Sequence, residues 1–287
     1  MPICLSQKLK GFIEITRLDK PIGIYLLLWP TLWAFFLNPN SMFSYSNLII
    51  FITGVVVMRS AGCVINDIAD IKVDGFVERT ANRPLQTGLI NKKSAKLIFY
   101  SLILIALLLV LNLNRFTIVL SFFALFFAII YPFMKRWVHL PQLFLGIAFG
   151  WSIPMAYAAQ NDFLDKSVWL LFAANIFYVI AYDTLYAMVD RDDDLKIGVK
   201  STAILFGNWD KTIIFIMQII MLTLLVFVGV NLNYNFYYYF SLLLSLLFFV
   251  YQQTYIRASK RERFFRAFQQ NHYVGVIILV GILLNYF

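Results

Sequence analysis

The acidic residues of this chain gather in two short clusters, each at the end of a long apolar stretch, although only 14% of the residues are charged. Carboxylates are costly to crowd together beside apolar segments unless cations neutralise them. The two clusters therefore indicate a site that holds divalent cations. The first cluster contains Asn66, Asp67, Asp70 and Asp74, and the second contains Asp183, Asp190, Asp192, Asp193 and Asp194.

The spacing inside each cluster predicts how the side chains are presented. Residues four positions apart lie on one face of a helix. The first cluster has this spacing at Asn66, Asp70 and Asp74, and the second has it at Asp190 and Asp194. Oxygen ligands without His or Cys select hard ions such as Mg²⁺, which shares its coordination shell with substrate phosphates. The spacing thus predicts two facing helix ends that hold a diphosphate through Mg²⁺.

The other members of the clusters have separate expectations. Asp67 is counted among the predicted metal ligands, whereas Asp192 and Asp193 fall off the shared face and are expected to be solvated. The alternative is that all these acids only cap helices or pair with loop cations. That alternative explains a single motif more readily than two motifs in matched positions.

Basic residues follow both clusters and suit the charge of a diphosphate. Arg83 stands out because Pro84 restricts the backbone beside it. For each of these cations the alternative explanation is the general excess of Lys and Arg in cytoplasmic loops. The predicted diphosphate-binding residues are Arg79, Arg83, Lys135, Arg136, Lys196 and Lys200.

Two ionisable residues, Arg59 and Asp183, lie deeper in the apolar stretches. Each precedes an acidic motif by seven residues and lies about 10 Å from it by helical rise. An Arg at this depth needs an anion, so the two groups either neutralise each other or serve a substrate. In the second case Arg59 receives an acidic acceptor, and Asp183 orients or deprotonates it.

The elements that must position these residues are membrane helices. The hydrophobic fraction is 61% and the mean hydropathy is +0.76, which is typical of a polytopic membrane protein. A backbone facing lipid must satisfy its own hydrogen bonds, so each apolar run is expected to be a helix. Nine runs are predicted to cross roughly 30 Å of hydrocarbon, at residues 22–37, 47–66, 97–113, 115–133, 141–159, 168–190, 212–230, 236–255 and 273–287.

The positions of Lys and Arg predict the topology. They concentrate in the amino-terminal segment and in alternate connections, whereas Arg115 and Lys166 stand on the other side. The amino terminus and both acidic clusters are therefore expected to be cytoplasmic and the carboxyl terminus periplasmic, with no removable signal peptide. Topology explains most of the +9 net charge, so no nucleic-acid partner is predicted. Cys4 and Cys63 are expected to be packing residues.

With these motifs, the chain resembles the membrane-embedded aromatic prenyltransferases, the superfamily that makes quinones, haem side chains and chlorophyll tails. The resemblance covers the whole chain. The HLPQ of residues 139–142 and the GWSIPMAYA of residues 150–158 make it most similar to the bacterial 4-hydroxybenzoate branch of ubiquinone biosynthesis. The segments that carry it are RLDKP (17–21), NDIADIKVD (66–74), ERTANRPLQTG (78–88), YPFMKR (131–136) and YDTLYAMVDRDDDLKIGVKST (182–202).

The resemblance implies an all-α fold, a single domain over residues 1–287 with nine transmembrane helices around a central cavity, in the bacterial inner membrane. It implies Mg²⁺ between the motifs, held by Asn66, Asp70, Asp74, Asp190 and Asp194. The implied reaction joins a polyprenyl diphosphate to the ring carbon beside the hydroxyl of 4-hydroxybenzoate and releases diphosphate. The isoprenoid tail would run through an opening toward the membrane lipids.

Further roles follow from the implied reaction. Six aromatic rings are expected to line the cavity and to stabilise an allylic cation through their π faces, namely those of Phe149, Trp151, Tyr157, Tyr178, Tyr182 and Tyr186. Arg59 or Arg17 is expected to pair with the benzoate carboxylate, and Arg59 is favoured by its depth.

Two competing functions remain open from the sequence. One is a prenyltransferase whose acceptor is a haem, naphthoate or chlorophyll precursor. The other is a cation-coupled transporter, because acids inside a membrane also mark ion pathways. A transporter would be favoured by helices that break at Gly or Pro near the bilayer midplane. The clustering of the acids at one membrane face favours an enzyme.

Overall fold

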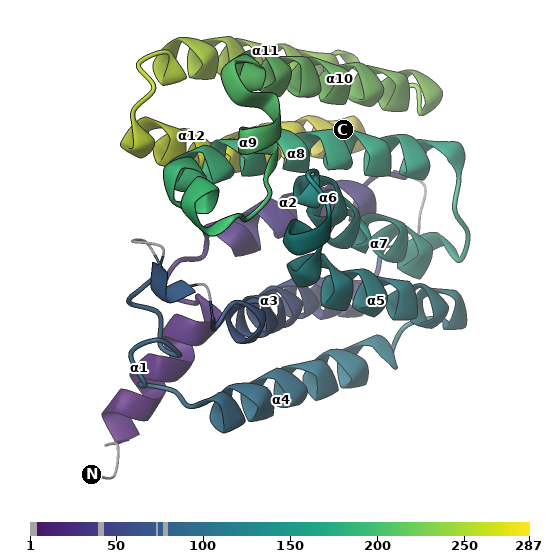
Figure 1. Cartoon of the computed structure of the whole chain (residues 1–287). Helices are drawn as coiled ribbons and strands as arrows, with labels where there is room; N and C mark the ends of the chain where they lie inside the picture. Colours follow the sequence, from purple (N-terminus) through teal and green to yellow (C-terminus); the bar gives the residue numbers. More distant parts are fainter. Residues whose placement is uncertain (1–4, 40–42, 73, 77–79) are drawn as a thin grey trace.

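The computed structural model describes residues 5–39, 43–72, 74–76 and 80–287, except for the side chains of Leu5, Phe76, Lys135 and Ile197. Every regular element in these ranges is helical (Figure 1), as the resemblance implied. The elements are α1 (Leu5–Thr16), α2 (Ile22–Phe35), α3 (Tyr45–Ala69), η1 (Asp74–Phe76), α4 (Lys92–Val110), α5 (Arg115–Trp137), α6 (Pro141–Gly150), α7 (Ser152–Asn161), α8 (Lys166–Ile197), α9 (Thr202–Phe206), η2 (Gly207–Trp209), α10 (Asp210–Asn231), α11 (Phe236–Ile256), α12 (Arg261–Leu283) and η3 (Leu284–Tyr286).

The helices correspond to the nine predicted spans. In the part of the chain that the structure describes, eight segments are long and apolar enough to cross a membrane. Two of these segments each consist of more than one helix: α6 and α7 form one, and α9 and α10 form the other. The shorter α2, with 14 residues and Pro30 inside it, supplies the first predicted span.

One predicted boundary is wrong, and one helix was not predicted. The last helix, α12, begins at Arg261 instead of residue 273, so residues 261–272, which the predicted spans left in a connection, are helical. Its first turns are polar, and a search for apolar runs therefore misses them. The structure also contains α1, an amphipathic helix of 12 residues that is too short and too polar to be counted as a span.

The longest helix, α8, carries the second acidic motif. Its 32 residues extend over about 48 Å at ~1.5 Å per residue, which exceeds the roughly 30 Å of a hydrocarbon core. The Asp165 side chain caps its amino end by accepting from the backbone N–H groups of Ser167 and Val168. Gly198 ends it with a left-handed φ of 71°, a conformation that favours glycine at the end of a helix.

Two groups of helices pack around separate hydrophobic cores. The larger core joins α2, α7, α8, α10, α11 and α12, and its buried aromatic residues include Trp33, Tyr178 and Tyr238. The smaller core joins α1, α3 and α4 around Ile15 and Val64. Figure 1 shows α3 and α4 on one side of the molecule and α10 and α11 on the other, with α8 between them.

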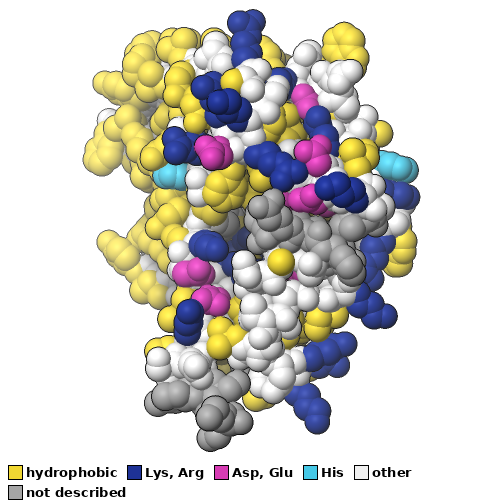
Figure 2. Space-filling model, turned by 60° about the vertical axis from the view of Figure 1, so that its left-hand side comes forward, with side chains coloured by type: hydrophobic (Ala, Val, Ile, Leu, Met, Phe, Trp, Pro, Cys, Tyr) yellow, Lys and Arg dark blue, Asp and Glu magenta, His cyan; other side chains and the backbone are white. Residues whose placement is uncertain are grey.

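The described outer surface carries many large exposed apolar side chains, and most of its charged side chains gather at one end (Figure 2). Large side chains such as Phe122 and Phe236 are 65% and 73% exposed, which suits contact with lipid. Figure 2 shows Lys, Arg, Asp and Glu gathered on the face that carries α1 and the connections before α4 and after α8. This asymmetry agrees with the predicted concentration of charge on one side of a membrane.

Candidate active site

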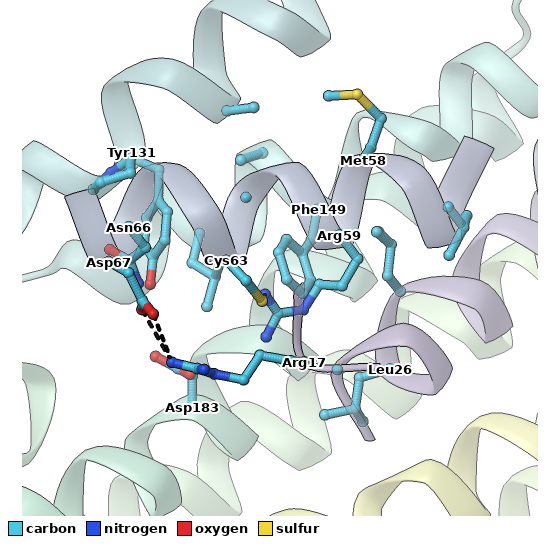
Figure 3. A pocket seen from close by; sticks show the side chains of 18 of the residues that line it. Arg17, Leu26, Met58, Arg59, Cys63, Asn66, Asp67, Tyr131, Phe149 and Asp183 are labelled. Atoms are coloured by element: carbon cyan, nitrogen blue, oxygen red, sulfur yellow. Dashed lines mark hydrogen bonds and ion pairs between the residues drawn. The ribbon is translucent and has the colours of Figure 1, made fainter. Parts of the chain in front are cut away.

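A large cavity of about 1050 Å³ lies between the two hydrophobic cores. Its walls come from α2, α3, α4, α5, α6 and α8, and residues beside α1 lie at its mouth. Both acidic motifs line it. Arg59 and Asp183 line it as well, and Figure 3 shows them beside Asn66 and Asp67 of the first motif. The structure thus brings into one space two motifs that are more than a hundred residues apart in the sequence.

The first motif continues past the end of α3. Ser44 caps the start of this helix, and its regular part ends at Ala69, so the expected single helical face ends before Asp74. The helical spacing nevertheless persists, because the N–H of Asp70 donates to the carbonyl of Asn66 and the N–H of Asp74 donates to that of Asp70, both at 2.9 Å. Asn66, Asp70 and Asp74 therefore all reach the cavity.

The second motif lies inside α8, before its capping glycine. Asp190 and Asp194 are one turn apart and both line the cavity. The intervening acids were expected to be solvated, and this is half correct. The side chain of Asp192 is 70% exposed, but that of Asp193 is only 15% exposed and lies 3.4 Å from Lys196 and 3.8 Å from Arg261.

Asp67 makes contacts that differ from those of its neighbours in the motif. Its carboxylate is 2% exposed and accepts two hydrogen bonds from Nη2 of Arg17, at 2.9 and 3.0 Å. Nη1 of Arg83 lies 3.0 Å from the same carboxylate and 2.6 Å from Asp74. Burial raises the pKa of the Asp74 carboxyl group, and the Arg83 guanidinium opposes that shift.

The other predicted diphosphate-binding cations differ in their distance from the cavity. Lys200 lines the cavity and donates to the carbonyl of Trp137 at 3.0 Å. Arg136 lies beside the first motif, where Nη2 donates to the carbonyl of Ala69 at 2.5 Å and approaches Asp70 at 3.8 Å. Lys196 instead faces Asp193 on the exposed side of α8.

Two predicted diphosphate ligands cannot be placed. Arg79 and the side chain of Lys135 lie outside the described residues.

Arg59 is held on three sides. Its Nη1 donates to the sulfur of Cys63 at 2.7 Å, and its guanidinium carbon lies 5.7 Å from the centre of the Phe149 ring. Gly23 of α2 packs against the guanidinium so closely that an added β-carbon would lie 2.6 Å from Nη2 and 2.8 Å from Cζ. These contacts fix the direction of a cation inside the cavity.

Aromatic side chains surround the inner part of the cavity. Tyr131, Tyr182 and Tyr186 line it together with Asp183. The Tyr182 side chain is 1% exposed, its hydroxyl has no hydrogen-bond partner, and its ring lies 6.0 Å from that of Phe268. Three of the six rings predicted to line the cavity do so, those of Phe149, Tyr182 and Tyr186. The other three are packed among helices instead, Tyr157 and Tyr178 in the larger core and Trp151 against Phe127 and Phe172.

Sequence reasoning missed three of the residues that shape this region. Cys63, expected to be only a packing residue, lies four residues after Arg59, and this spacing was a usable signal. Tyr131 was noted only as part of a motif. Gly23 could not have been found, because its approach to Arg59 depends on how α2 crosses α3.

Comparison with known proteins identifies the family. A profile of the UbiA prenyltransferase family matches residues 27–275. The chain belongs to this family. As a UbiA family member with apolar helices along its length, it is a multi-pass membrane protein.

UbiA family relatives match the chain from end to end. The 4-hydroxybenzoate octaprenyltransferase of Vibrio atlanticus is 51% identical, with 98% of this chain and 99% of the relative covered. The protein of the same name from Aliivibrio fischeri strain ES114 is 54% identical, with 96% and 97% covered. That of Pasteurella multocida is 53% identical, with 100% and 99% covered.

Solved structures of UbiA homologues share the architecture. The apo structure of the Aeropyrum pernix K1 homologue has a TM-score of 0.80 and 26% identity, with 92% of this chain and 98% of the homologue covered. The Archaeoglobus fulgidus homologue bound to GPP and Mg²⁺ has a TM-score of 0.73 and 15% identity, with 96% and 99% covered, and shows the fold alone. The all-helical membrane fold is thereby confirmed, and the described residues supply eight long candidate spans and the shorter apolar helix α2.

The donor set of the UbiA cavity suits a hard cation. Asn66, Asp70 and Asp74 face the space that Asp190 and Asp194 also line, and all five offer oxygen. Among the described residues, however, no three His, Cys, Asp or Glu side chains converge closely enough to hold a metal by themselves. Ions between the two motifs would need further oxygen ligands, which water and a diphosphate supply.

The transporter alternative depends on a broken helix, and the UbiA cavity does have one beside it. The segment of α6 and α7 breaks at Trp151, between Gly150 and Ser152. The acids come from the unbroken helix α8 and from the end of α3, and Ser152 instead bonds to Thr31 of α2 at 2.7 Å. Among the described residues, Gly150, Trp151 and Ser152 at the break carry no carboxylate, so the break itself supplies no acidic ion ligand.

Proposed function

We propose that this chain transfers a polyprenyl group from an allylic polyprenyl diphosphate to the ring carbon beside the hydroxyl of 4-hydroxybenzoate, with release of diphosphate. The relatives named 4-hydroxybenzoate octaprenyltransferase, more than half identical over nearly the whole chain, support this acceptor. The structural observation that carries the proposal is the single cavity lined by both acidic motifs and by Arg59.

The diphosphate end of the cavity is the charged mouth. We propose Asn66, Asp70, Asp74, Asp190 and Asp194 as the residues that hold Mg²⁺. When bound, Mg²⁺ would neutralise the negative charge that grows on the leaving diphosphate. The homologue from Archaeoglobus fulgidus bound to GPP and Mg²⁺ supports the choice of ion.

Arginine and lysine side chains complete the proposed diphosphate site. Arg83, Arg136 and Lys200 lie beside the first motif or line the cavity, where guanidinium and ammonium groups can donate to phosphate oxygens. Arg79 and Lys135 remain proposed ligands on the basis of the sequence motifs. Lys196 is directed to Asp193, so its proposed contribution requires the side chain to turn away from that partner.

The acceptor lies deeper in this proposal. Arg59, fixed by Cys63 and Phe149, would pair with the carboxylate of 4-hydroxybenzoate. The bond between the allylic carbon and oxygen breaks with its electron pair on diphosphate. The ring carbon beside the hydroxyl then bonds to that allylic carbon and loses its proton, for which Asp183 is the proposed base.

The allylic carbon becomes electron-poor before the new bond forms, and water must not reach it. The rings of Tyr182 and Tyr186 line this part of the cavity and offer π faces to the developing cation. Leu107 of α4 and Phe122 of α5 belong to the wall yet are 44% and 65% exposed. We propose that the isoprenoid tail leaves the cavity toward lipid beside these two residues.

The proposed location is the bacterial inner membrane. The charged end of the molecule, with α1 and both acidic motifs, would face the cytoplasm, and the carboxyl terminus would face the periplasm. Water-soluble 4-hydroxybenzoate and Mg²⁺ would then enter from the cytoplasm, and the polyprenyl tail from the bilayer.

The test is a reconstituted reaction. Purified protein is incubated with Mg²⁺, 4-hydroxybenzoate and a polyprenyl diphosphate, and the coupled product is sought by mass. Omission of Mg²⁺ and the Asp190→Ala variant serve as controls. Coupled product only in the complete mixture supports the proposal. Transfer to a naphthoate or another acceptor, without transfer to 4-hydroxybenzoate, would instead identify a different member of the superfamily.

A further inference from the structure

Asp67 differs from the other acids of its motif in the direction in which its side chain points. It follows Asn66 directly, and one residue turns the side chain by about 100° around an α-helix. Asn66 and Asp70 share one face of α3, and Asp67 is turned by about 60–100° from these two residues, although it lines the same cavity. Figure 3 shows its carboxylate joined to Arg17 by two dashed lines.

Asp67 links two segments that are distant in the sequence. Both of its oxygens accept a hydrogen bond from Nη2 of Arg17, at 3.0 and 2.9 Å. Arg17 lies directly after α1. Oδ1 also lies 3.0 Å from Nη1 of Arg83, in the connection between α3 and α4. The carboxylate is 2% exposed, and the two arginine side chains are 23% and 15% exposed, so water screens these pairs weakly.

The segments joined at Asp67 also touch each other. Gly11 of α1 packs against Ile90 so closely that an added β-carbon would lie 2.9 Å from Cγ1 of that residue. Arg17 has a left-handed φ of 58°, a costly conformation for a residue with a β-carbon. Its side chain also donates from Nη1 to the carbonyl of Glu14 at 2.5 Å, and the contacts of both amino groups favour this conformation.

We propose that Asp67 is a positioning residue, which docks α1 and the connection containing Arg83 over the mouth of the cavity through Arg17 and Arg83. The inference rests on the proposed function, since the mouth is where the diphosphate would bind. Arg83 already contacts Asp74 at 2.6 Å, so Asp67 fixes a phosphate-binding cation beside a proposed metal ligand. Preorganised cations of this kind stabilise a leaving diphosphate without rearrangement.

The proposal assigns different roles from those predicted by the sequence. Arg17 serves the diphosphate end through Asp67 and does not bind the acceptor carboxylate. Asp67 serves the metal motif without coordinating Mg²⁺. Substitutions at Asp67 and Arg17 are therefore expected to change the KM for polyprenyl diphosphate, and not the acceptor KM or the Mg²⁺ requirement.

The test compares Asp67→Asn, Arg17→Ala and the double variant in steady-state kinetics. Each single change is expected to raise the KM for polyprenyl diphosphate about tenfold, with the acceptor KM and the Mg²⁺ concentration for half-maximal rate unchanged. The double variant is expected to lose no more than Asp67→Asn alone, because Arg17 acts only through Asp67. A raised Mg²⁺ requirement in Asp67→Asn, a raised acceptor KM in Arg17→Ala, or additive losses would overturn the proposal.

A second readout does not require activity. Trypsin cleavage after Lys10 and Arg17 is expected to be several times faster in Asp67→Asn than in the parent, because α1 is no longer docked. Arg261→Ala is the matched control, since it breaks contacts with Asp192 and Asp193 that lie away from the cavity. Unchanged cleavage in Asp67→Asn would contradict the docking role. If the parent protein formed no product, the proposed function would fail. The cleavage measurement would still test whether Asp67 docks α1.

Discussion

Gly23 of α2 and Arg59 of α3 approach so closely that the guanidinium lies where a β-carbon at position 23 would need space. That β-carbon would lie 2.6 Å from Nη2 and 2.8 Å from Cζ of Arg59, closer than side-chain carbons are found in proteins. Gly23 is buried, and α2 therefore forms one wall of the seat in which Arg59 is held. The direction of the proposed acceptor-binding cation depends on the absence of a side chain on the neighbouring helix.

Gly23→Ala is expected to turn the Arg59 side chain out of this seat. The acceptor KM should rise at least about tenfold, because a small misplacement of a positioning group is costly in catalysis. The KM for polyprenyl diphosphate should change little. Gly54→Ala is the matched control: Gly54 also lines the cavity, but nothing lies within 4 Å of an added β-carbon there. An equal rise in the control would mean that added bulk, and not the seat of Arg59, is responsible.

The chemistry of the site was visible in the sequence to different degrees. The spacing of Asn66 and Asp70 and of Asp190 and Asp194 depends on local helical geometry, which short-range spacing predicts well. Their meeting in one cavity was expected from matched membrane depth and appears in the structure. The depth of Arg59 followed from the same helical rise.

Features that depend on how distant segments pack together could not be predicted in the same way. Whether Asp67 faces a metal or two arginines depends on where α1 and the connection before α4 fold, and neither is set by spacing along α3. The start of α12 was missed because its first turns at Arg261 and Glu262 are polar although helical. Tertiary packing decides such features, and apolar periodicity does not report it.

Arg59→Ala is expected to weaken binding of the acceptor carboxylate. The acceptor KM should rise by about one to two orders of magnitude, the range for loss of a charge-assisted hydrogen bond of ~1.5–3 kcal/mol. The informative measurement compares 4-hydroxybenzoate with its neutral amide. The parent should prefer the acid strongly, and Arg59→Ala should show little preference. An unchanged acceptor KM would exclude the proposed carboxylate contact and leave neutralisation of Asp183 as the function of Arg59.

Asp70→Ala and Asp190→Ala are expected to remove transfer while the protein still inserts into the membrane. Each takes one proposed Mg²⁺ ligand from a different motif, and the loss in kcat should be at least about 10²-fold. Asp192→Ala is the control, because this side chain is 70% exposed and lies outside the cavity lining. Full activity in either ligand variant, measured on membranes with equal amounts of protein, would remove the metal-bridge mechanism.

Gly198→Ala is expected to destabilise the end of α8. Gly198 has a φ of 71°, and a residue with a β-carbon pays roughly 1 kcal/mol or more in that conformation. Nothing lies within 4 Å of the added β-carbon, so the effect should come from the backbone alone. Thermal unfolding in detergent should show a lower Tm for Gly198→Ala and no decrease for Gly62→Ala, which has equal space inside helix α3. An equal decrease in both variants would refute the role of the left-handed cap.

Tyr182 offers a test of whether the ring or the hydroxyl group acts on the allylic cation. Its hydroxyl has no hydrogen-bond partner and its side chain is 1% exposed, whereas its ring contacts Tyr178 at 5.1 Å and Phe268 at 6.0 Å between centroids. If the π face stabilises the cation, Tyr182→Phe should keep kcat within about twofold, and Tyr182→Leu should lower it roughly tenfold, in line with a cation–π contribution of about 1–2 kcal/mol. A large loss in Tyr182→Phe would assign the function to the hydroxyl, through a substrate hydrogen bond. Equal activity in the Phe and Leu variants would reduce the ring to a packing role.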